Sequence, residues 1–307
     1  MRQATHCVHK RAKQDLFGKL AIAGFLTWIP DKLYLRIRYR QLTGKTLNLD
    51  NPKTYNEKLQ WLKVYGANPA YTALADKYLV RDFVRKTIGE EYLIPSLGVW
   101  DTFDEIDFGR LPKQFVLKTN HDSGGIVICK DKDSFDIDQA RQKLDKHLKR
   151  NFYWYGREPQ YKKIRPRIIA EQYMADDSDC ELKDYKFFCF NGAPKFLYIS
   201  AGLDDHTTAQ ISFFDLDGNR MPFKRKDYAP LQSEMPIPPH FAEMKAVAAQ
   251  LAVSVDAPCL RVDLYEIHGR IYFSELTFFP CGGFLPFEPE EWDQILGEWI
   301  TLPEKRK

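Results

Sequence analysis

The feature that most restricts the possible folds of this chain is a pair of apolar segments near its C-terminal end, residues 260–265 and 270–276. A Gly-containing turn separates them, so they predict an antiparallel β-hairpin. Alternate residues of a strand share a face, which places Arg261 and Asp263 together on the first strand. The turn brings Asp263 opposite or close to Glu275 on the returning strand. The fold must therefore contain a sheet that sets two acidic side chains next to each other.

Two carboxylates on facing strands repel each other unless a cation or a proton lies between them. Such a pair suits Mg²⁺, which often binds one or two carboxylates together with water and substrate phosphates. The hairpin alone fits slightly better with a simpler alternative, an exposed polar face on which Arg261 neutralises Asp263. Asp263 and Glu275 are candidate metal ligands that need support from elsewhere in the sequence.

A second candidate site is a loop between two short apolar segments, residues 115–118 and 126–129, which predict another hairpin. Lys118 ends the first segment, and the loop contains Ser-Gly-Gly at residues 123–125. Glycines let backbone N–H groups approach phosphate oxygens, and a nearby lysine supplies positive charge. The loop lacks the G-x-x-x-x-G-K-[ST] pattern, so an ordinary hairpin turn with a solvated lysine is the alternative.

A third candidate is the apolar segment 168–174, in which Glu171 precedes a polar linker. A strand that runs into a linker can offer backbone groups to the edge of an adenine and apolar side chains to its faces. Taken alone, this segment would be only a buried strand.

The composition excludes several classes of protein. The 307 residues are 44% hydrophobic and 28% charged, which is typical of a soluble globular chain of about one to three domains. A net charge of +3 is too small for a general nucleic-acid binder, so no nucleic-acid partner is expected. The six cysteines include no C-x-x-C pair and no Cys/His cluster with zinc spacing. This pattern predicts a reduced, cytoplasmic protein.

An apolar stretch near the N-terminus, residues 20–29, is far shorter than the roughly 20 residues that span a bilayer. Basic residues flank it, but no small-x-small cleavage site follows. We expect an N-terminal helix that docks on the body of the protein. The second interpretation is a helix resting on a membrane surface, helped by Arg36, Arg38 and Arg40.

The rest of the chain mixes helical and strand patterns without a repeat or a low-complexity linker. Strands are predicted over residues 185–190, 195–199 and 211–215, the first two forming a hairpin around Asn-Gly. This mixture predicts an α+β fold with mostly antiparallel sheets. Helices are predicted over residues 55–65, 71–87, 135–151 and 241–253.

In their order along the chain, the loop after Lys118, the segment 168–174 and the C-terminal hairpin resemble the ATP-grasp superfamily. The resemblance is closer still to its TupA-like branch, found in bacterial surface-polysaccharide biosynthesis, and spans about residues 45–303. The segments that carry it are Tyr55–Leu62, Ala75–Tyr78, Leu117–Gly124, Leu182–Phe188 and Arg261–Tyr265.

The resemblance implies an α+β ATP-grasp fold, in which two lobes with mostly antiparallel sheets hold ATP between them. It divides the chain into a helical N-terminal extension, a region before the ATP-grasp core, a small lobe with the Gly-rich loop and a C-terminal lobe with the Mg²⁺ site. The expected bounds of these four parts are residues 1–54, 55–112, 113–173 and 174–303.

The resemblance also assigns nucleotide contacts by position. Lys118 would contact the α- or β-phosphate, the loop at 123–125 would cover the phosphates, and the linker at 171–174 would hold adenine. The expected nucleotide-binding residues are Lys77, Lys118, Ser123, Gly124, Gly125, Glu171, Gln172, Tyr173, Met174, Lys186 and, for the ribose hydroxyls, Glu181.

The metal site follows from the same resemblance. Asp263 and Glu275 would ligate Mg²⁺, and Arg261 would face the γ-phosphate or the developing oxyanion. Many ATP-grasp enzymes have Asn two positions after the second carboxylate, where this chain has Thr277. The Thr277 hydroxyl would bind the ion directly or through water, which leaves open whether one or two Mg²⁺ ions bind.

The implied reaction is an ATP-dependent ligation of a carboxylate to an amine through an acylphosphate. Phosphoryl transfer needs positioning and charge neutralisation, which Mg²⁺ and basic residues supply. His121, beside the Gly-rich loop, would aid the γ-phosphate or deprotonate the amine; a histidine that only hydrogen-bonds the loop backbone is an equally good interpretation. The expected catalytic residues are Arg261, Lys118 and His121.

Family context suggests that a uronic-acid carboxylate of a surface polysaccharide is amidated with an amino acid or other amine. The aromatic segment 153–157 and the basic run 162–167 would contact an acidic sugar. Packed aromatics at a surface helix end explain these segments slightly better. The expected location is the cytoplasm, with the inner face of the membrane as a possible site.

Two other functions compete with the ligase. A glycosyltransferase often needs a D-x-D metal motif, which Asp215-Leu216-Asp217 matches, but the adjoining Gly218-Asn219 indicates a hairpin turn instead. A non-catalytic nucleotide- or carbohydrate-binding protein would keep the fold without turning over ATP.

Overall fold

The computed structural model describes residues 15–174, 184–201, 209–232 and 238–305. Its helices are α2 (Leu16–Ile22), α3 (Asp31–Thr43), α4 (Tyr55–Tyr65), α5 (Tyr71–Ala75), α6 (Val80–Thr87), α7 (Ile137–Leu148), α8 (Tyr153–Gly156), α9 (Phe241–Val255) and α10 (Glu291–Glu298). Its strands are β1 (Ser96–Trp100), β2 (Phe115–Thr119), β3 (Ile126–Cys129), β4 (Ile168–Gln172), β5 (Asp184–Phe190), β6 (Ala193–Ala201), β7 (Gln210–Asp215), β8 (Lys224–Arg225), β9 (Cys259–Ile267), β10 (Arg270–Thr277) and β11 (Phe287–Glu288).

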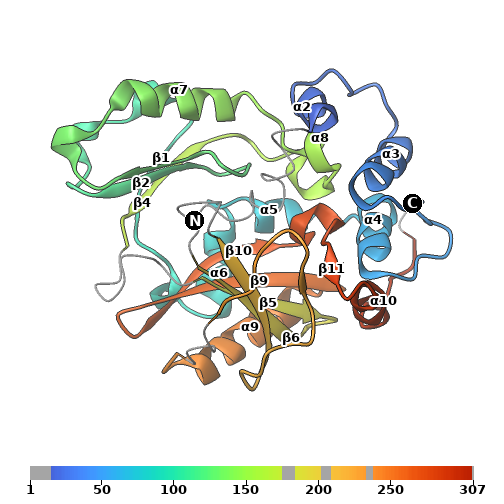
Figure 1. The fold of residues 1–307 in the computed structure, drawn as a ribbon. Coiled ribbons are helices and arrows are strands. Elements are labelled where there is room, and N and C mark those ends of the chain that lie inside the picture. Colours follow the sequence, from blue (N-terminus) through green and yellow to red (C-terminus); the bar gives the residue numbers. More distant parts are fainter. Residues whose placement is uncertain (1–14, 175–183, 202–208, 233–237, 306–307) are drawn as a thin grey trace.

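The smaller lobe is a four-stranded antiparallel sheet in the order β1-β4-β2-β3. Helix α7 covers one face of this sheet (Figure 1). Phe115 and Leu117 pack there with Leu144 in a separate core. Because strand residues alternate, Lys118 lies on the opposite face, which looks toward the larger lobe. The predicted hairpin of residues 115–118 and 126–129 is confirmed.

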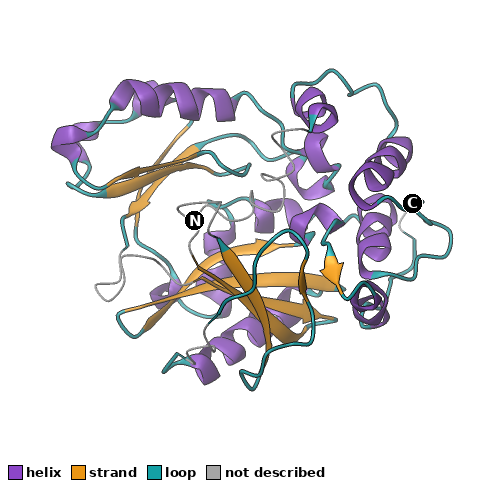
Figure 2. Ribbon diagram, viewed as in Figure 1, coloured by secondary structure: helices purple, strands orange, loops and turns teal. Residues whose placement is uncertain are grey.

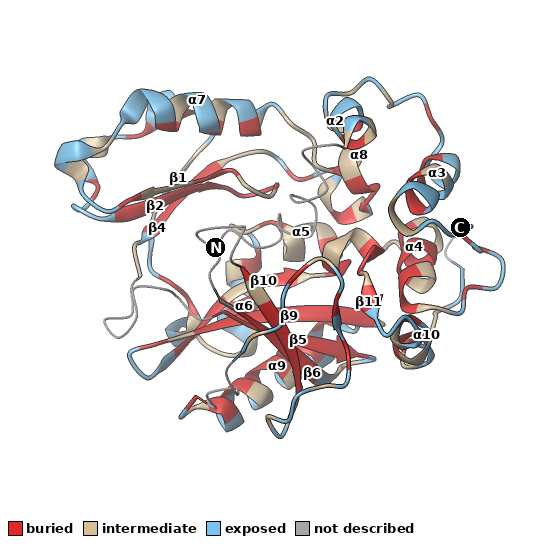
Figure 3. Ribbon diagram, viewed as in Figure 1, coloured by how far each residue is buried: buried red, intermediate tan, exposed pale blue. Residues whose placement is uncertain are grey.

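The larger lobe is a five-stranded antiparallel sheet in the order β10-β9-β5-β6-β7, with α9 packed against one face (Figure 2). Phe187, Val262 and Leu264 belong to the core on that side, together with Leu251 of α9. Buried residues run along the whole length of the central strands (Figure 3). The mixture of helices and antiparallel sheets confirms the predicted α+β class.

The C-terminal hairpin has the predicted register, since Glu275 is the partner of Asp263 across β9 and β10. Strand β10 departs from the strict alternation of an ideal strand. The register shifts between Phe273 and Glu275, so Ser274 forms a bulge. Ser274 and Glu275 consequently both reach the same cleft.

The helix predicted over residues 71–87 is divided into α5 and α6 at Asp76. The Asp76 carboxylate accepts hydrogen bonds from the backbone N–H groups of Tyr78 and Leu79, which starts a new turn. Its second oxygen accepts a hydrogen bond from Asn120 at 2.9 Å. A tertiary contact with the loop after β2 therefore ends the first helix.

The apolar stretch of residues 20–29 is helical only to Ile22, and Gly24 follows with a φ of 88°. Helix α2 packs through Gly18 and Ala21, with Gly18 close to the ring of Tyr155 in α8. None of the helices described here is both long and apolar enough to cross a membrane. Strand β1, from the region before residue 113, is an edge strand of the small-lobe sheet.

Helix α4 fixes the segment that follows β10. The buried Asn56 side chain donates to the Leu285 carbonyl at 2.9 Å and accepts from the Leu285 N–H at 2.8 Å. It also donates to Asp293 in α10 at 2.9 Å. One asparagine thus joins α4 and α10 to the chain that leaves the C-terminal hairpin.

Asn56→Ala should lower the free energy of unfolding by about 3 kcal/mol, because the buried Leu285 backbone groups lose their partner. Urea denaturation of the full chain measures this change. Asn48→Ala is the matched control, since Asn48 accepts hydrogen bonds only from the exposed backbone of Asp50 and Asn51. Equal losses in the two variants would contradict the proposed tie.

Candidate active site

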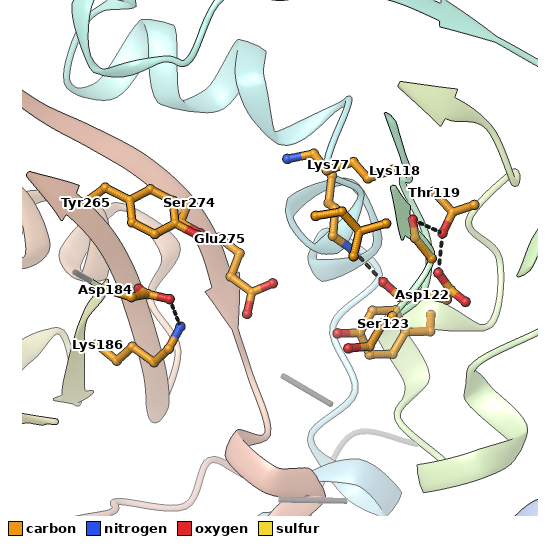
Figure 4. A pocket seen from close by; sticks show the side chains of 14 residues that line it. Lys77, Lys118, Thr119, Asp122, Ser123, Asp184, Lys186, Tyr265, Ser274 and Glu275 are labelled. Atoms are coloured by element: carbon orange, nitrogen blue, oxygen red, sulfur yellow. Dashed lines mark hydrogen bonds and ion pairs between the residues drawn. The ribbon is translucent and has the colours of Figure 1, made fainter. Parts of the chain in front are cut away.

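A cleft lies between the loop after β2 and the open face of the large-lobe sheet (Figure 4). Its volume is about 610 Å³, including the part open to solvent. Seven residues expected from the sequence line this cleft, contributed by both lobes. The lining consists of Lys77, Lys118, Thr119, Asp122, Ser123, Gly124, Gly125, Ile126, Tyr161, Asp184, Lys186, Tyr265, Ser274 and Glu275.

Lys118 provides positive charge on the small-lobe wall. Its Nζ lies 2.6 Å from a carboxylate oxygen of Glu171, and Arg81 lies 3.5 Å from the other oxygen. Burial lowers the pKa of Lys118, and the Glu171 charge opposes that shift. The side chain of Glu171 thus faces Lys118 on the neighbouring strand rather than the linker expected to hold adenine. It can keep Lys118 protonated and aimed into the cleft.

The Gly-rich loop is anchored from below by Asp122. One oxygen of its buried carboxylate accepts a hydrogen bond from Thr119, and the other is bonded to His147 of α7. Burial raises the pKa of Asp122, but the hydrogen bonds from His147 and Thr119 outweigh burial and the net pKa is lowered. A Cβ on Gly125 would lie 2.0 Å from the Thr119 hydroxyl oxygen. Only a glycine backbone can lie this close to the Thr119 hydroxyl. This close approach places the backbone of the loop at the cleft.

Lys77 ties the loop to the segment between α5 and α6. Its Nζ donates to the Asp122 carbonyl at 2.6 Å, and its backbone N–H donates to the Asn120 carbonyl at 3.1 Å. The Lys77 side chain therefore lies at the edge of the loop, next to Ser123 and Gly124 in the cleft lining.

His121 is buried and lies outside the residues that line the cleft. Its Nε2 is 3.1 Å from the Arg150 carbonyl. Burial lowers the pKa of His121, which favours the neutral ring. The histidine therefore bonds backbone, as in the alternative, but at Arg150 after α7 rather than in the Gly-rich loop.

Asp263 is the buried centre of the large-lobe wall. Arg261 holds both of its oxygens, with Nε and a terminal nitrogen each at 2.7 Å, and Lys186 donates to one of them. Burial raises the pKa of Asp263, but Arg261 and Lys186 outweigh it and the net pKa is lowered. Burial lowers the pKa of Lys186, while Asp184 and Asp263 raise it to a net increase. Both groups are therefore charged.

Glu275 is the most exposed of the carboxylates that line the cleft, with a quarter of its side chain exposed. Its Oε1 lies 3.1 Å from Arg261 and accepts a hydrogen bond from Thr277 at 3.2 Å. Arg261 and Thr277 stand behind it, outside the residues that line the cleft. No described residue bonds the second carboxylate oxygen, so this oxygen can meet an ion.

The donors fit Mg²⁺ only in part. Among the described residues, no group of three or more His, Cys, Asp or Glu side chains has the arrangement of a metal site. Glu275 fits, since Mg²⁺ accepts a single carboxylate completed by phosphates and water. Asp263 has both oxygens engaged by Arg261 and Lys186, so it would bind an ion only by exchanging one of these contacts.

The linker after β4 is described as far as Met174, and Glu181 lies outside the described residues. Gln172 is exposed, and Tyr173 is half-buried. Met174 packs on an apolar cluster that includes Tyr265 and Tyr272. Because Tyr265 also lines the cleft, this cluster offers apolar surface next to the linker.

Sequence reasoning did not select Tyr161 or Asp184 for the cleft. Asp184 alternates with Lys186 on β5, and its carboxylate lies 2.6 Å from the Lys186 Nζ. Burial raises the pKa of Asp184, and the Asp263 charge adds to the increase. The Asp-x-Lys spacing was a readable signal for Asp184. No local sequence pattern predicts that Tyr161 lines the cleft. The turn after α8 places it there.

Two other predicted features are explained by local packing. Arg157 is buried, donates to the Leu26 carbonyl at 2.8 Å and stacks on Tyr34, so it serves the contact with the N-terminal extension. Asp215 accepts hydrogen bonds from the backbone of Asp217 and Asn219 in its own turn. The structure therefore supports packed aromatics over a sugar contact at Arg157, and a turn over a D-x-D metal motif.

Known proteins resemble this chain in sequence and, more loosely, in fold. The sequence profile of the TupA-like ATP-grasp family matches residues 57–301 of this chain. The curated proteins contain no match.

Several solved structures are loosely similar in fold. D-alanine–D-alanine ligase from Bacillus anthracis, complexed with ATP, is 15% identical over 67% of this chain and 55% of its own, with a TM-score of 0.39. L-amino acid ligase from Bacillus licheniformis is 13% identical over 71% of this chain and 46% of its own, with a TM-score of 0.40. D-alanine–D-alanine ligase from Helicobacter pylori is 14% identical over 82% of this chain and 70% of its own, with a TM-score of 0.45. This chain spans about half the length of the first two.

Glu171→Gln should weaken nucleotide binding at alkaline pH. Burial lowers the pKa of Lys118, and the Glu171 charge counteracts part of that decrease. Without this charge, the pKa of Lys118 falls further below its ordinary value. A lysine holds phosphate while it is protonated, so affinity should be lost at a lower pH than in the wild type. Titration of a fluorescent ATP analogue from about pH 7 to about pH 10 measures the shift.

Glu243→Gln is the control for this change, because Glu243 is exposed and bonds Tyr92 instead. An unchanged pH midpoint in Glu171→Gln would show that Glu171 does not act on Lys118.

Proposed function

This chain belongs to the TupA-like ATP-grasp family, and from that premise we propose that it is an ATP- and Mg²⁺-dependent ligase that joins a carboxylate to an amine. The observation that carries the proposal is the cleft shared by the two lobes. Lys77, Lys118 and the loop at residues 123–125 stand on one wall, opposite Lys186 and Glu275 on the other. Positive groups and loop N–H groups suit a triphosphate, and Glu275 suits its metal ion.

The reaction takes place in two steps. An oxygen of the substrate carboxylate attacks the γ-phosphorus of ATP, the bond to the β-γ bridging oxygen breaks, and ADP leaves. The amine then attacks the carbonyl carbon of the acylphosphate, inorganic phosphate departs and the amine proton passes to solvent or phosphate. Atoms and charge balance without a protein nucleophile, so the protein positions and neutralises the reacting groups.

The residues of the two walls have separate tasks in this scheme. Lys118 and Lys77 offset phosphate charge, and the anchored loop lays its N–H groups along the phosphates. Mg²⁺ bound at Glu275 would offset the charge that builds up during transfer. Arg261 lies outside the cleft lining, with its Nη2 3.1 Å from the Glu275 Oε1. It holds the Glu275 carboxylate in place and also binds Asp263. Closure of the two lobes on the substrates would exclude water that hydrolyses the acylphosphate.

For the substrates, we infer a uronic-acid carboxylate of a bacterial surface polysaccharide and an amino acid or other amine. The support is the family resemblance together with the exposed Lys162 and Lys163, which directly follow the cleft residue Tyr161. Positive charge at the cleft rim would attract an acidic sugar. The use of ATP fits a cytoplasmic reaction, as do the described cysteines, which form no disulfide with one another.

A glycosyltransferase is less well supported, because Asp215 is occupied in its own turn. The distinguishing experiment incubates the full chain with Mg-ATP, uronate-bearing oligosaccharides and a panel of amines. ADP release with a product mass increased by the amine, less one water, supports the ligase. Release of UDP from a sugar nucleotide supports the glycosyltransferase. Nucleotide binding without either product supports a non-catalytic protein.

Glu275→Gln should reduce Mg-dependent ADP formation roughly 100-fold, because the cleft loses its accessible carboxylate for the metal ion. Glu266→Gln is the matched control on the same hairpin, where Glu266 bonds His240 instead. A coupled assay of ADP release, with Mg²⁺ varied, provides the measurement. Wild-type turnover and wild-type Mg²⁺ dependence in Glu275→Gln would refute the metal assignment.

A further inference from the structure

Exposed apolar side chains concentrate in the N-terminal extension. Of the eight large hydrophobic residues exposed in the described part of the chain, five lie between residues 16 and 33. Scattered single apolar residues are normal on a surface, but a cluster of this size marks an interaction site. Its members are Leu16, Leu20, Phe25, Trp28 and Leu33, with Trp28 77% exposed.

Both helices of the extension turn one face inward and leave the other face largely exposed. In α2, Gly18 and Ala21 are buried, and Leu16 and Leu20 lie one turn apart on the outer face. The turn that follows α2 carries the exposed Phe25. The outer surface of α2 and its turn is therefore apolar.

Helix α3 continues this surface with positive charge. Its buried face consists of Tyr34, Leu35, Arg38 and Tyr39. The exposed Arg36 and Arg40 lie one turn apart on the opposite face, beside Lys32 and Leu33. The two helices occupy the same corner of the molecule (Figure 1).

Negative charge does not balance this corner. Asp15 is paired with Arg38 on the inner side, and Asp31 is bonded to Tyr153 at 2.5 Å and lies 3.6 Å from Arg157. No other acidic residue occurs between residues 15 and 45. The outer surface therefore combines leucine, phenylalanine and tryptophan with unbalanced arginine.

We propose that this surface, formed by residues 16–40, binds an anionic phospholipid membrane. Aromatic and leucine side chains enter the interface of a bilayer, where tryptophan is especially favoured, while arginine and lysine meet anionic headgroups. A protein partner would need an acidic, apolar groove, whereas a bilayer supplies both chemistries over any area. The inference is independent of ligase activity and goes beyond it.

The proposed membrane-binding surface, residues 16–40, is connected to the cleft through α8. Tyr34 donates to the Tyr155 carbonyl at 2.8 Å, and Arg157 donates to the Leu26 carbonyl at 2.8 Å. The chain then reaches the cleft residue Tyr161 four positions later. Docking at a bilayer would therefore hold one wall of the cleft at a fixed position from the lipid, which suits a membrane-attached acidic substrate.

Flotation of the full chain with vesicles tests the proposal. We expect binding to vesicles of phosphatidylcholine mixed with phosphatidylglycerol, and at least about tenfold weaker binding to phosphatidylcholine alone. Phe25→Ser with Trp28→Ser, and separately Arg36→Glu with Arg40→Glu, should each weaken binding to the mixed vesicles by about tenfold or more. Leu79→Ser with Val253→Ser is the control, because these exposed apolar residues lie elsewhere.

Circular dichroism and ATP-analogue binding confirm that each variant is folded. Equal binding to both vesicle types, no binding to either, or wild-type binding by both surface variants would overturn the proposal. So would a wild-type dimer that Phe25→Ser with Trp28→Ser abolishes while the monomeric variant binds vesicles normally, since that result assigns the surface to a second copy of the chain.

Discussion

The buried charge network around Asp263 is the interaction on which the cleft depends. Removing a carboxylate from water costs several kcal/mol unless its oxygens are held by opposite charges. Arg261 meets both oxygens in parallel and Lys186 meets one of them, so the charge is compensated. Because Lys186, Asp263 and Glu275 are register partners across β5, β9 and β10, the network also fixes the sheet edge that presents Glu275.

The small lobe repeats the same principle. Lys118 faces the cleft, Glu171 holds it from the side and is itself paired with Arg81, and Asp122 stands beneath the Gly-rich loop with both oxygens engaged. On each wall, a group that can meet ligand is backed by buried partners of opposite charge. Such support fixes the geometry before a nucleotide arrives and lowers the entropic cost of binding. The fold therefore brings two preorganised walls together, which the proposed ligase would use for the phosphates and for their metal ion.

Local sequence pattern predicted much of this arrangement. Period-two alternation placed Arg261 with Asp263, and the short turn set the register that makes Glu275 the partner of Asp263. The pattern could not show the bulge at Ser274, because a bulge depends on how the paired strand packs. It also could not separate charged residues that reach the cleft from those that support them. The resemblance predicted that Glu171 begins an adenine-binding linker, yet its side chain pairs with Lys118 on the neighbouring strand, a contact set by the sheet order.

The most direct test of the central claim uses an ATP derivative whose terminal phosphate carries a reactive acyl group, which transfers to lysine amines beside the bound phosphates. Mass spectrometry of the digested protein identifies the labelled lysines. If the triphosphate lies between the two walls, Lys118 or Lys77 is labelled, and excess Mg-ATP suppresses that labelling. Labelling confined to lysines outside the cleft, unaffected by Mg-ATP, would contradict the proposed nucleotide site.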